Sequence, residues 1–228
     1  MRRIIATVAV GEHEELLQLA LHRIQNFANK YDYEISVCRK KLDTRPTTWT
    51  KILHILKLME DFDEILWIDS DTVILSDVSD IAEEIHADTD LAWVWHTYDN
   101  QTHPNSGVMY IKVNERSRQL FITANQQEDL TNHPWSDQAA LMRVLGIDST
   151  VWPIGPGDII EILELGLQKL PNKWNSIRQD SAFQQARYRT WQPVQLPDCG
   201  ESFRHDVSRY DRRRLLRILL FRGAAFIM

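Results

Sequence analysis

The fold is decided by one stretch of the chain, Ile65-Leu66-Trp67-Ile68-Asp69-Ser70-Asp71. Four successive apolar residues are typical of a strand that is buried on both faces of a parallel sheet. Two aspartates follow directly where that strand should end. Because ligands of open parallel sheets bind beyond the carboxyl ends of the strands, we expect Asp69 and Asp71 to lie at a binding site.

Two strand–helix units precede this stretch. Apolar runs predict strands at Ile4–Val10 and Glu34–Arg39, and apolar residues at helical spacing predict helices at Glu12–Asn29 and Thr48–Glu60. The strand at Glu64–Ile68 is the third. This alternation indicates an α/β fold of Rossmann-like type, with a mostly parallel central sheet flanked by helices.

The pattern is less regular farther along. We predict strands at Leu91–Trp95 and Gly107–Lys112 around a polar loop, helices at Asn114–Asn125 and Asp137–Leu145, and a short strand at Val151–Ile154. No stretch has the composition of a linker. The sequence therefore predicts a single domain over residues 1–228.

Charge and hydropathy exclude several classes of protein. The 228 residues carry a net charge of -6, of which residues 204–228 contribute +5. An acidic body argues against a nucleic-acid partner. The first apolar run is too short for a signal peptide and no run approaches the ~18 residues of a membrane span, so we expect a cytoplasmic protein. A basic helix at 206–228 could dock on the domain or lie on an anionic membrane.

The Asp-x-Asp pair has more than one interpretation. Two carboxylates at a strand end suit a hard divalent cation, whereas a solvated turn is the structural alternative. Asp69-Ser70-Asp71-Thr72-Val73 also resembles the first motif of haloacid-dehalogenase phosphatases, in which Asp69 would be a nucleophile. That motif usually lies on the first strand of the chain, and Gly157-Asp158-Ile159-Ile160-Glu161 matches the late acidic pair of that group poorly.

A broader resemblance spans residues 5 to 205. Pro46-Thr47-Thr48-Trp49-Thr50-Lys51-Ile52, the Asp-Ser-Asp strand, Asn105-Ser106-Gly107 and Trp135-Ser136-Asp137-Gln138 together resemble glycosyltransferase family 34. Leu170-Pro171-Asn172-Lys173-Trp174-Asn175 is similar to a segment of the glycogenin-like family 8, and His205 stands where these families have a late histidine. No single motif is decisive, but their order is specific.

The resemblance implies a single-domain GT-A fold with a nucleotide-sugar-binding half at 1–112, an acceptor- and metal-completing half at 113–205 and the basic helix at 206–228. It implies a metal-dependent glycosyltransferase that moves a hexose or pentose, with retention, from a UDP-sugar or, as the second choice, GDP-mannose. The acceptor would be a saccharide, a lipid-linked sugar or a protein. A phosphatase and a non-catalytic carbohydrate-binding protein remain the alternatives.

The resemblance also implies roles for particular residues. Asp69, Asp71 and His205 would hold Mn²⁺ or Mg²⁺, and Asp137, Gln138 and Lys51 would be catalytic. The donor would be bound by Val8, Ala9, His13, Lys51, Asp69, Ser70, Asn105, Ser106, Gly107, Trp174 and Asn175.

Several of these residues also have structural interpretations. Lys51 is expected on the helix face opposite the apolar stripe, where most lysines are solvated. Ser136 would make a good helix N-cap, and Asp137 would favour the helix dipole in the first turn. Of the eight tryptophans, about half are expected in the core, and Trp135 and Trp174 are expected to stack on a carbohydrate acceptor.

Overall fold

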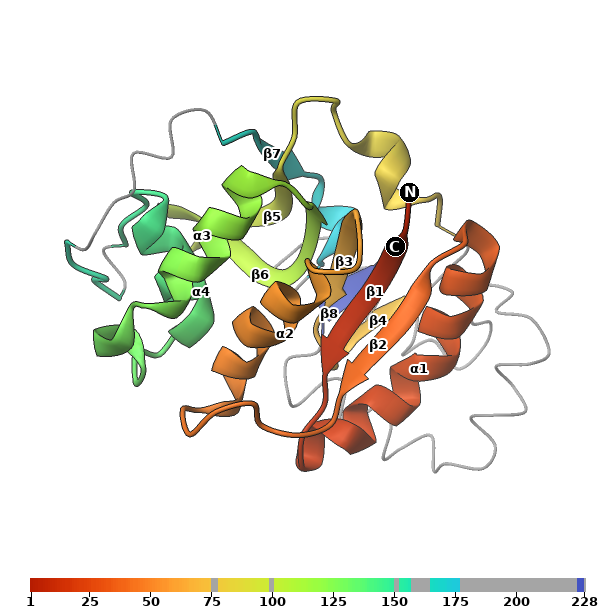
Figure 1. Ribbon diagram of the computed structural model, residues 1–228, viewed down its shortest axis with the longest axis horizontal. Coiled ribbons are helices and arrows are strands. Elements are labelled where there is room, and N and C mark those ends of the chain that lie inside the picture. The colour runs from red at the N-terminus through yellow and green to blue at the C-terminus, as the bar shows by residue number, and fades with distance from the viewer. Residues whose placement is uncertain (75–77, 99–100, 150–151, 157–164, 177–224, 228) are drawn as a thin grey trace.

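A six-stranded sheet with helices on both faces forms the centre of the molecule (Figure 1). The computed structural model describes residues 1–74, 78–98, 101–149, 152–156, 165–176 and 225–227. The strand order is β2 (Glu34–Cys38), β1 (Arg3–Val8), β3 (Glu64–Ile68), β6 (Gln101–Lys112), β5 (Leu91–Tyr98) and β7 (Leu167–Leu170). Only β6 runs antiparallel to its neighbours, which confirms the mostly parallel sheet.

The helices and a second, small sheet complete the described fold. The helices are α1 (Glu12–Tyr31), α2 (Thr50–Leu58), α3 (Glu115–Asn125) and α4 (Ser136–Val144). Short 3₁₀ turns lie at η1 (Thr47–Trp49), η2 (Ile81–Glu84), η3 (Glu128–Leu130) and η4 (Asn172–Trp174). The small sheet pairs β4 (Thr72–Ile74) with β8 (Ala225–Ile227).

Strand β3 separates two hydrophobic cores because successive side chains point to opposite faces of a sheet. Ile65 and Trp67 pack in the core that holds apolar residues of α2, α3 and α4. Leu66 and Ile68 pack in the other core, which holds α1, β4 and the buried residue of β8. The whole strand is buried, as its apolar run predicts.

Two predicted elements differ from the structure. The β5–β6 hairpin extends through the stretch expected to be a polar loop, because polar residues pair across it, as in the hydroxyl contact of 2.9 Å between Thr97 and Thr102. The strand predicted at Val151–Ile154 is wrong for residues 152–154, which form no strand. There the amide of Ile154 instead donates to Oδ1 of Asp148 at 3.1 Å.

The basic helix predicted at 206–228 is wrong for its last described residues. Ala225–Ile227 form β8, which runs parallel to β4. Residues 206–224 lie outside the described ranges, as does His205. None of the helices among the described residues is long and apolar enough to cross a membrane. The division of the chain at residues 112 and 205 stays a prediction.

Candidate active site

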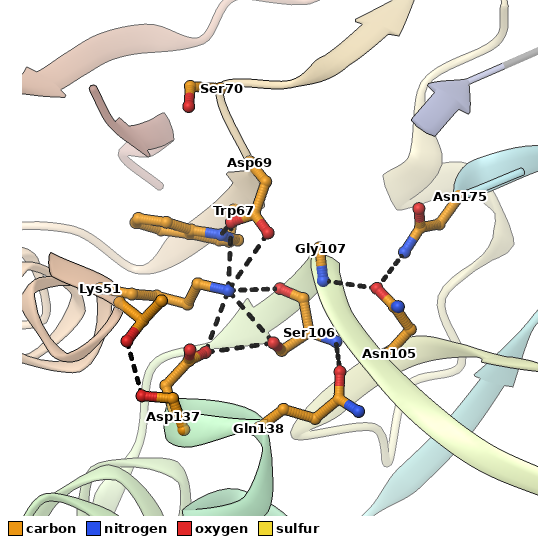
Figure 2. A network of polar contacts seen from close by, with 12 residues as sticks. Lys51, Trp67, Asp69, Ser70, Asn105, Ser106, Gly107, Asp137, Gln138 and Asn175 are labelled. Atoms are coloured by element: carbon orange, nitrogen blue, oxygen red, sulfur yellow. Dashed lines mark hydrogen bonds and ion pairs between the residues drawn. The ribbon is translucent and has the colours of Figure 1, made fainter. Parts of the chain in front are cut away.

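The candidate site lies where four elements meet at the carboxyl end of β3. Asp69 follows the last residue of β3, and its amide donates to the carbonyl of Gly107 at 2.8 Å. Because β6 is antiparallel to β3, residues 105–107 of β6 lie beside this end of β3. The first turns of α2 and α4 bring Lys51 and Asp137 to the same place (Figure 2).

The ammonium group of Lys51 is the centre of the network. Its Nζ lies 3.1 Å from Oδ1 of Asp69 and 3.0 Å from Oδ2 of Asp137. It also donates to the carbonyl and hydroxyl oxygens of Ser106, both at 3.1 Å. Lys51 is only 6% exposed, so the structural alternative of a solvated lysine is wrong. The helix buries this lysine because α4 and β6 supply partners for its charge.

Electrostatics keep Lys51 charged. Burial by itself lowers the pKa of its ammonium group, but the attraction of Asp137 and then Asp69 outweighs that effect, and the pKa is raised above its usual value. Burial raises the pKa of Asp137, and the attraction of Lys51 offsets part of that rise. Lys51 is therefore a fixed positive charge at neutral pH, shared by two carboxylates.

The start of α4 is shaped differently from the predicted cap. Trp135 occupies the N-cap position, and Ser136 is the first helical residue, with a left-handed φ of 45°. The Ser136 hydroxyl lies 2.5 Å from that of Thr48 and caps no helix amide, so the N-cap prediction is wrong. A left-handed conformation at a residue other than glycine costs about 1–3 kcal/mol and is concentrated at functional sites.

Asp137 and Gln138 both contact Ser106. The Ser106 hydroxyl donates to Oδ2 of Asp137 at 3.1 Å, and the Ser106 amide donates to Oε1 of Gln138 at 3.1 Å. Asp137 is 4% exposed. The structure thus brings together the three predicted catalytic residues around one serine of β6.

A second group of polar side chains flanks Gly107. Oδ1 of Asn105 accepts from the Gly107 amide at 2.8 Å and from Nδ2 of Asn175 at 2.7 Å. A Cβ atom on Gly107 would lie 2.9 Å from Asn105 Oδ1 and 3.2 Å from Asn175 Nδ2, so a side chain there would displace these two amide groups. Asn175 is fully buried, and its Oδ1 has no hydrogen-bond partner among the described residues.

The Asp-Ser-Asp turn carries two neighbouring carboxylates, those of Asp69 and Asp71. Burial and the neighbouring Asp69 raise the pKa of Asp71 to about 6. Lys51 contacts the carboxylates of Asp69 and Asp137 and also attracts that of Asp71, so among the described residues three carboxylates share this cation. Carboxylate oxygens are the hard ligands that Mg²⁺ and Mn²⁺ prefer, so Asp69 and Asp71 fit part of such a site. Within the described ranges no group of three or more histidine, cysteine or acidic side chains could hold a metal, and the expected third ligand, His205, lies outside them.

The other predicted donor-binding residues lie at or near the same sheet edge. The ring of the exposed His13 lies 3.1 Å from the hydroxyl of Ser70, which is buried. Val8 is the last residue of β1, which pairs with β3. Ala9 follows it, and its amide donates to the carbonyl of Cys38 at 2.9 Å and not to the Lys51 network.

The tryptophans divide between core and site. Trp49, Trp67, Trp93 and Trp174 are at most 1% exposed. The buried ring of Trp174 donates from Nε1 to Glu84 at 3.0 Å, so only its neighbour Asn175 reaches the network. Trp135 is half-buried, with its ring 5.0 Å from that of His103.

One site residue was missed by the sequence analysis. The indole Nε1 of Trp67 donates to Oδ1 of Asp69 at 2.7 Å, although Trp67 was predicted only as a core residue. The available signal was its position two residues before Asp69, which places both side chains on the same face of an extended chain.

Comparisons with solved structures show the fold. The chain is similar to a glycosyltransferase involved in glycosylation of the major capsid of PBCV-1, with 12% identity and a TM-score of 0.53 over 76% of this chain and 82% of that one. It is also similar to the galactosyltransferase LgtC solved with donor and acceptor sugar analogues, with 17% identity and a TM-score of 0.50 over 94% of both chains.

A third similar structure is the glycosyltransferase GlyE of Streptococcus pneumoniae TIGR4, with 14% identity and a TM-score of 0.51. The match covers 87% of this chain and 53% of GlyE, so the chain spans about half the length of that protein. None of the curated proteins compared matches the sequence.

A family model decides between the alternatives that the sequence left open. The model described as nucleotide-diphospho-sugar transferase matches residues 15–173, which include the Asp-Ser-Asp turn, Lys51 and Asp137. The phosphatase and the non-catalytic binding protein are therefore set aside. The chain belongs to the nucleotide-diphospho-sugar transferase family and is a glycosyltransferase with a GT-A-like fold.

Proposed function

We propose that this glycosyltransferase moves a hexose or pentose, with retention, from a UDP-sugar to a hydroxyl acceptor and requires Mn²⁺ or Mg²⁺. GDP-mannose is the second donor to be tested. The acceptor is a saccharide, a lipid-linked sugar or a protein. The observation that carries the proposal is the buried Lys51, held between Asp69 and Asp137 beside the Asp-Ser-Asp turn.

The charges of the site support a metal–diphosphate donor. Asp69 and Asp71 would hold the cation with His205 as the third ligand, and the cation would stabilise the negative charge that develops on the leaving diphosphate. Lys51 adds a fixed positive charge next to Asp69. The amides of Asn105 and Asn175 would bind hydroxyl groups of the donor sugar. The buried Oδ1 of Asn175, an acceptor without a partner among the described residues, supports this role.

The arrangement of Asp137 supports retention without a covalent intermediate. Its Oδ2 is bound by both Lys51 and Ser106, which lowers its strength as a nucleophile. In the proposed step the acceptor oxygen bonds to the anomeric carbon on the face from which the diphosphate leaves, and the leaving oxygen takes the acceptor proton. The site then acts by positioning and charge stabilisation. Proton NMR of the product, recorded before it mutarotates, should show the anomeric configuration of the donor; the opposite configuration would refute retention.

A thermal-shift panel tests the donor and the metal. UDP-sugars and GDP-sugars should raise the melting temperature in the presence of Mn²⁺ or Mg²⁺ and not in its absence. The shift should vanish in Asp71→Asn, which keeps the size of the side chain and removes its charge. It should persist in the matched control Asp61→Asn, because Asp61 is exposed and precedes β3, whereas the turn follows the opposite end of that strand. A panel with no shift for any nucleotide sugar would overturn the proposal.

The cellular location and any membrane contact stay predictions. A cytoplasmic protein that touches an anionic membrane through residues 206–224 would sediment with phosphatidylserine vesicles and be released by about 0.5 M salt. Binding to neutral vesicles, or none to anionic vesicles, would contradict this contact.

A further inference from the structure

Strand β8 lies between two segments that lead into the candidate site. It pairs in parallel with β4, with Thr72 opposite Ala225 and Ile74 opposite Ile227. β4 begins at the residue after Asp71. On its other side β8 contacts η4, and Asn175 follows η4 directly. Figure 2 shows the blue strand beside the cyan segment that carries Asn175.

The contact is held by packing as well as by backbone pairing. Ile227 is 2% exposed and belongs to the core that includes Val73, Ile74 and Trp174. These three residues come from the two segments on either side of β8. The side chain of Ile227 therefore packs in the same core as the strand after Asp71 and the turn before Asn175.

β4 packs against α1, but its backbone depends on β8 for strand pairing. It has three residues, and β8 is its only strand partner in the part of the chain that the structure describes. A strand this short is marginal without pairing and packing. The Asp-Ser-Asp turn leads directly into β4, and the amide of Thr72, the first residue of β4, donates to the carbonyl of Asp69 at 2.9 Å. Loss of the β8 pairing would therefore loosen the turn that carries Asp71.

We propose that residues 225–227 are a positioning element of the donor site: they touch no substrate, and they hold the Asp71 turn and Asn175 in a fixed relation. This inference rests on the proposed function in assigning Asp71 to the cation and Asn175 to the donor sugar. It adds that donor affinity depends on a strand that begins 50 residues after Asn175 in the sequence, as the positions of β8 and Asn175 show. Neither the Asp-Ser-Asp motif nor the segment that contains Asn175 indicates, from its sequence, a dependence on residues 225–227.

The test compares Ile227→Ala with the matched control Ile4→Ala. Both remove the same atoms from a buried isoleucine, with 2% and 3% exposure, but Ile4 lies near the start of β1, opposite Ile65 and away from the site. In the metal-free protein, hydrogen exchange of the amides at 72–74 and 172–175 should accelerate about tenfold in Ile227→Ala and be unchanged in Ile4→Ala. Hydrogen exchange of the β1 amides should accelerate in Ile4→Ala and be unchanged in Ile227→Ala.

Donor binding supplies the second readout. In Ile227→Ala the Kd for the UDP-sugar with Mn²⁺, and the KM, should rise about fivefold or more, while kcat changes less than twofold, since the groups that touch the reacting atoms are unaltered. If Ile227→Ala does not fold, Ile227→Val gives the same comparison with a smaller truncation. Equal exchange at 72–74 and 172–175 in the Ile227 and Ile4 variants would overturn the inference. If the wild-type protein binds no nucleotide sugar, the proposed function fails, and the exchange experiment still decides whether β8 holds the two segments.

Discussion

Lys51 forms ion pairs with two carboxylates of the candidate site, those of Asp69 and Asp137. Replacing it by Met keeps the length of the side chain and leaves Asp69 and Asp137 without their shared cation. Breaking a buried ion pair in this way costs about 3–5 kcal/mol of unfolding free energy, so Lys51→Met should be strongly destabilised and lose transfer activity about 100-fold or more. Urea unfolding and initial rates measure both effects.

Lys57→Met is the matched control for this variant. Lys57 lies on the same helix and is exposed, and exposed substitutions usually change the unfolding free energy by less than about 0.5 kcal/mol. A Lys51→Met protein as stable and active as Lys57→Met would show that the buried ion pair has no role.

Replacing Gly107 should affect donor binding more than it affects the stability of the fold. In Gly107→Ala the new Cβ would lie 2.9 Å from Oδ1 of Asn105 and 3.2 Å from Nδ2 of Asn175, so these side chains must move. Both atoms are ends of side chains and not backbone, so the unfolding free energy should fall by less than about 1.5 kcal/mol. Donor affinity, measured by calorimetry, should fall about tenfold. Wild-type affinity in this variant would mean that neither asparagine binds the donor.

Asp90 joins three elements at the other end of the sheet. Its carboxylate, at the start of β5, accepts from Nε of Arg116 in α3 at 2.7 Å and from the amide of Gly166, next to β7, at 2.8 Å. These partners hold the pKa of Asp90 below its usual value against the effect of burial. Asp90→Asn should lower the unfolding free energy at pH 7 by about 2 kcal/mol, because it removes charge-assisted hydrogen bonds.

The loss of unfolding free energy in Asp90→Asn should be largest near neutral pH and smaller in acid. A carboxyl group with a lowered pKa in the folded state stabilises the protein above its unfolded pKa of about 4, and that contribution is lost as the pH falls through the folded value. Urea unfolding at several pH values should show a constant difference between wild type and Asp90→Asn above about pH 5 that shrinks in acid. The exposed Asp88→Asn is the control. A difference that grew in acid would contradict the assigned role.

At the scale of the whole molecule, the sheet divides the apolar interior into two cores. Ile24 of α1 and Ile55 of α2 are fully buried on opposite faces. Each Ile→Ala variant should lose about 2–5 kcal/mol of unfolding free energy, and the double variant should lose the sum to within about 0.5 kcal/mol. Urea unfolding of the four proteins measures this. A large departure from additivity would show that the two cores are coupled through the sheet.

The sequence predicted those elements whose patterns are local. The buried strand before Asp69, the helices at α1 and α2 and the mostly parallel sheet follow from apolar periodicity, and the structure confirms them. The strand predicted at 151–154 and the helix predicted to include 225–227 were wrong, because short apolar runs fit either type of element until their neighbours are known.

The sequence by itself determined the α/β class, the position of Asp69 and Asp71 at a strand end and the order of motifs typical of a glycosyltransferase. Only the tertiary structure decided that Lys51 is buried, that Ser136 adopts a left-handed conformation and that β8 lies between β4 and η4. The physical reason is that burial of a charge and pairing of a short strand depend on partners supplied by distant parts of the chain. Lys51 has apolar neighbours in its own helix, and the carboxylates that stabilise its charge come from the turn after β3 and from α4.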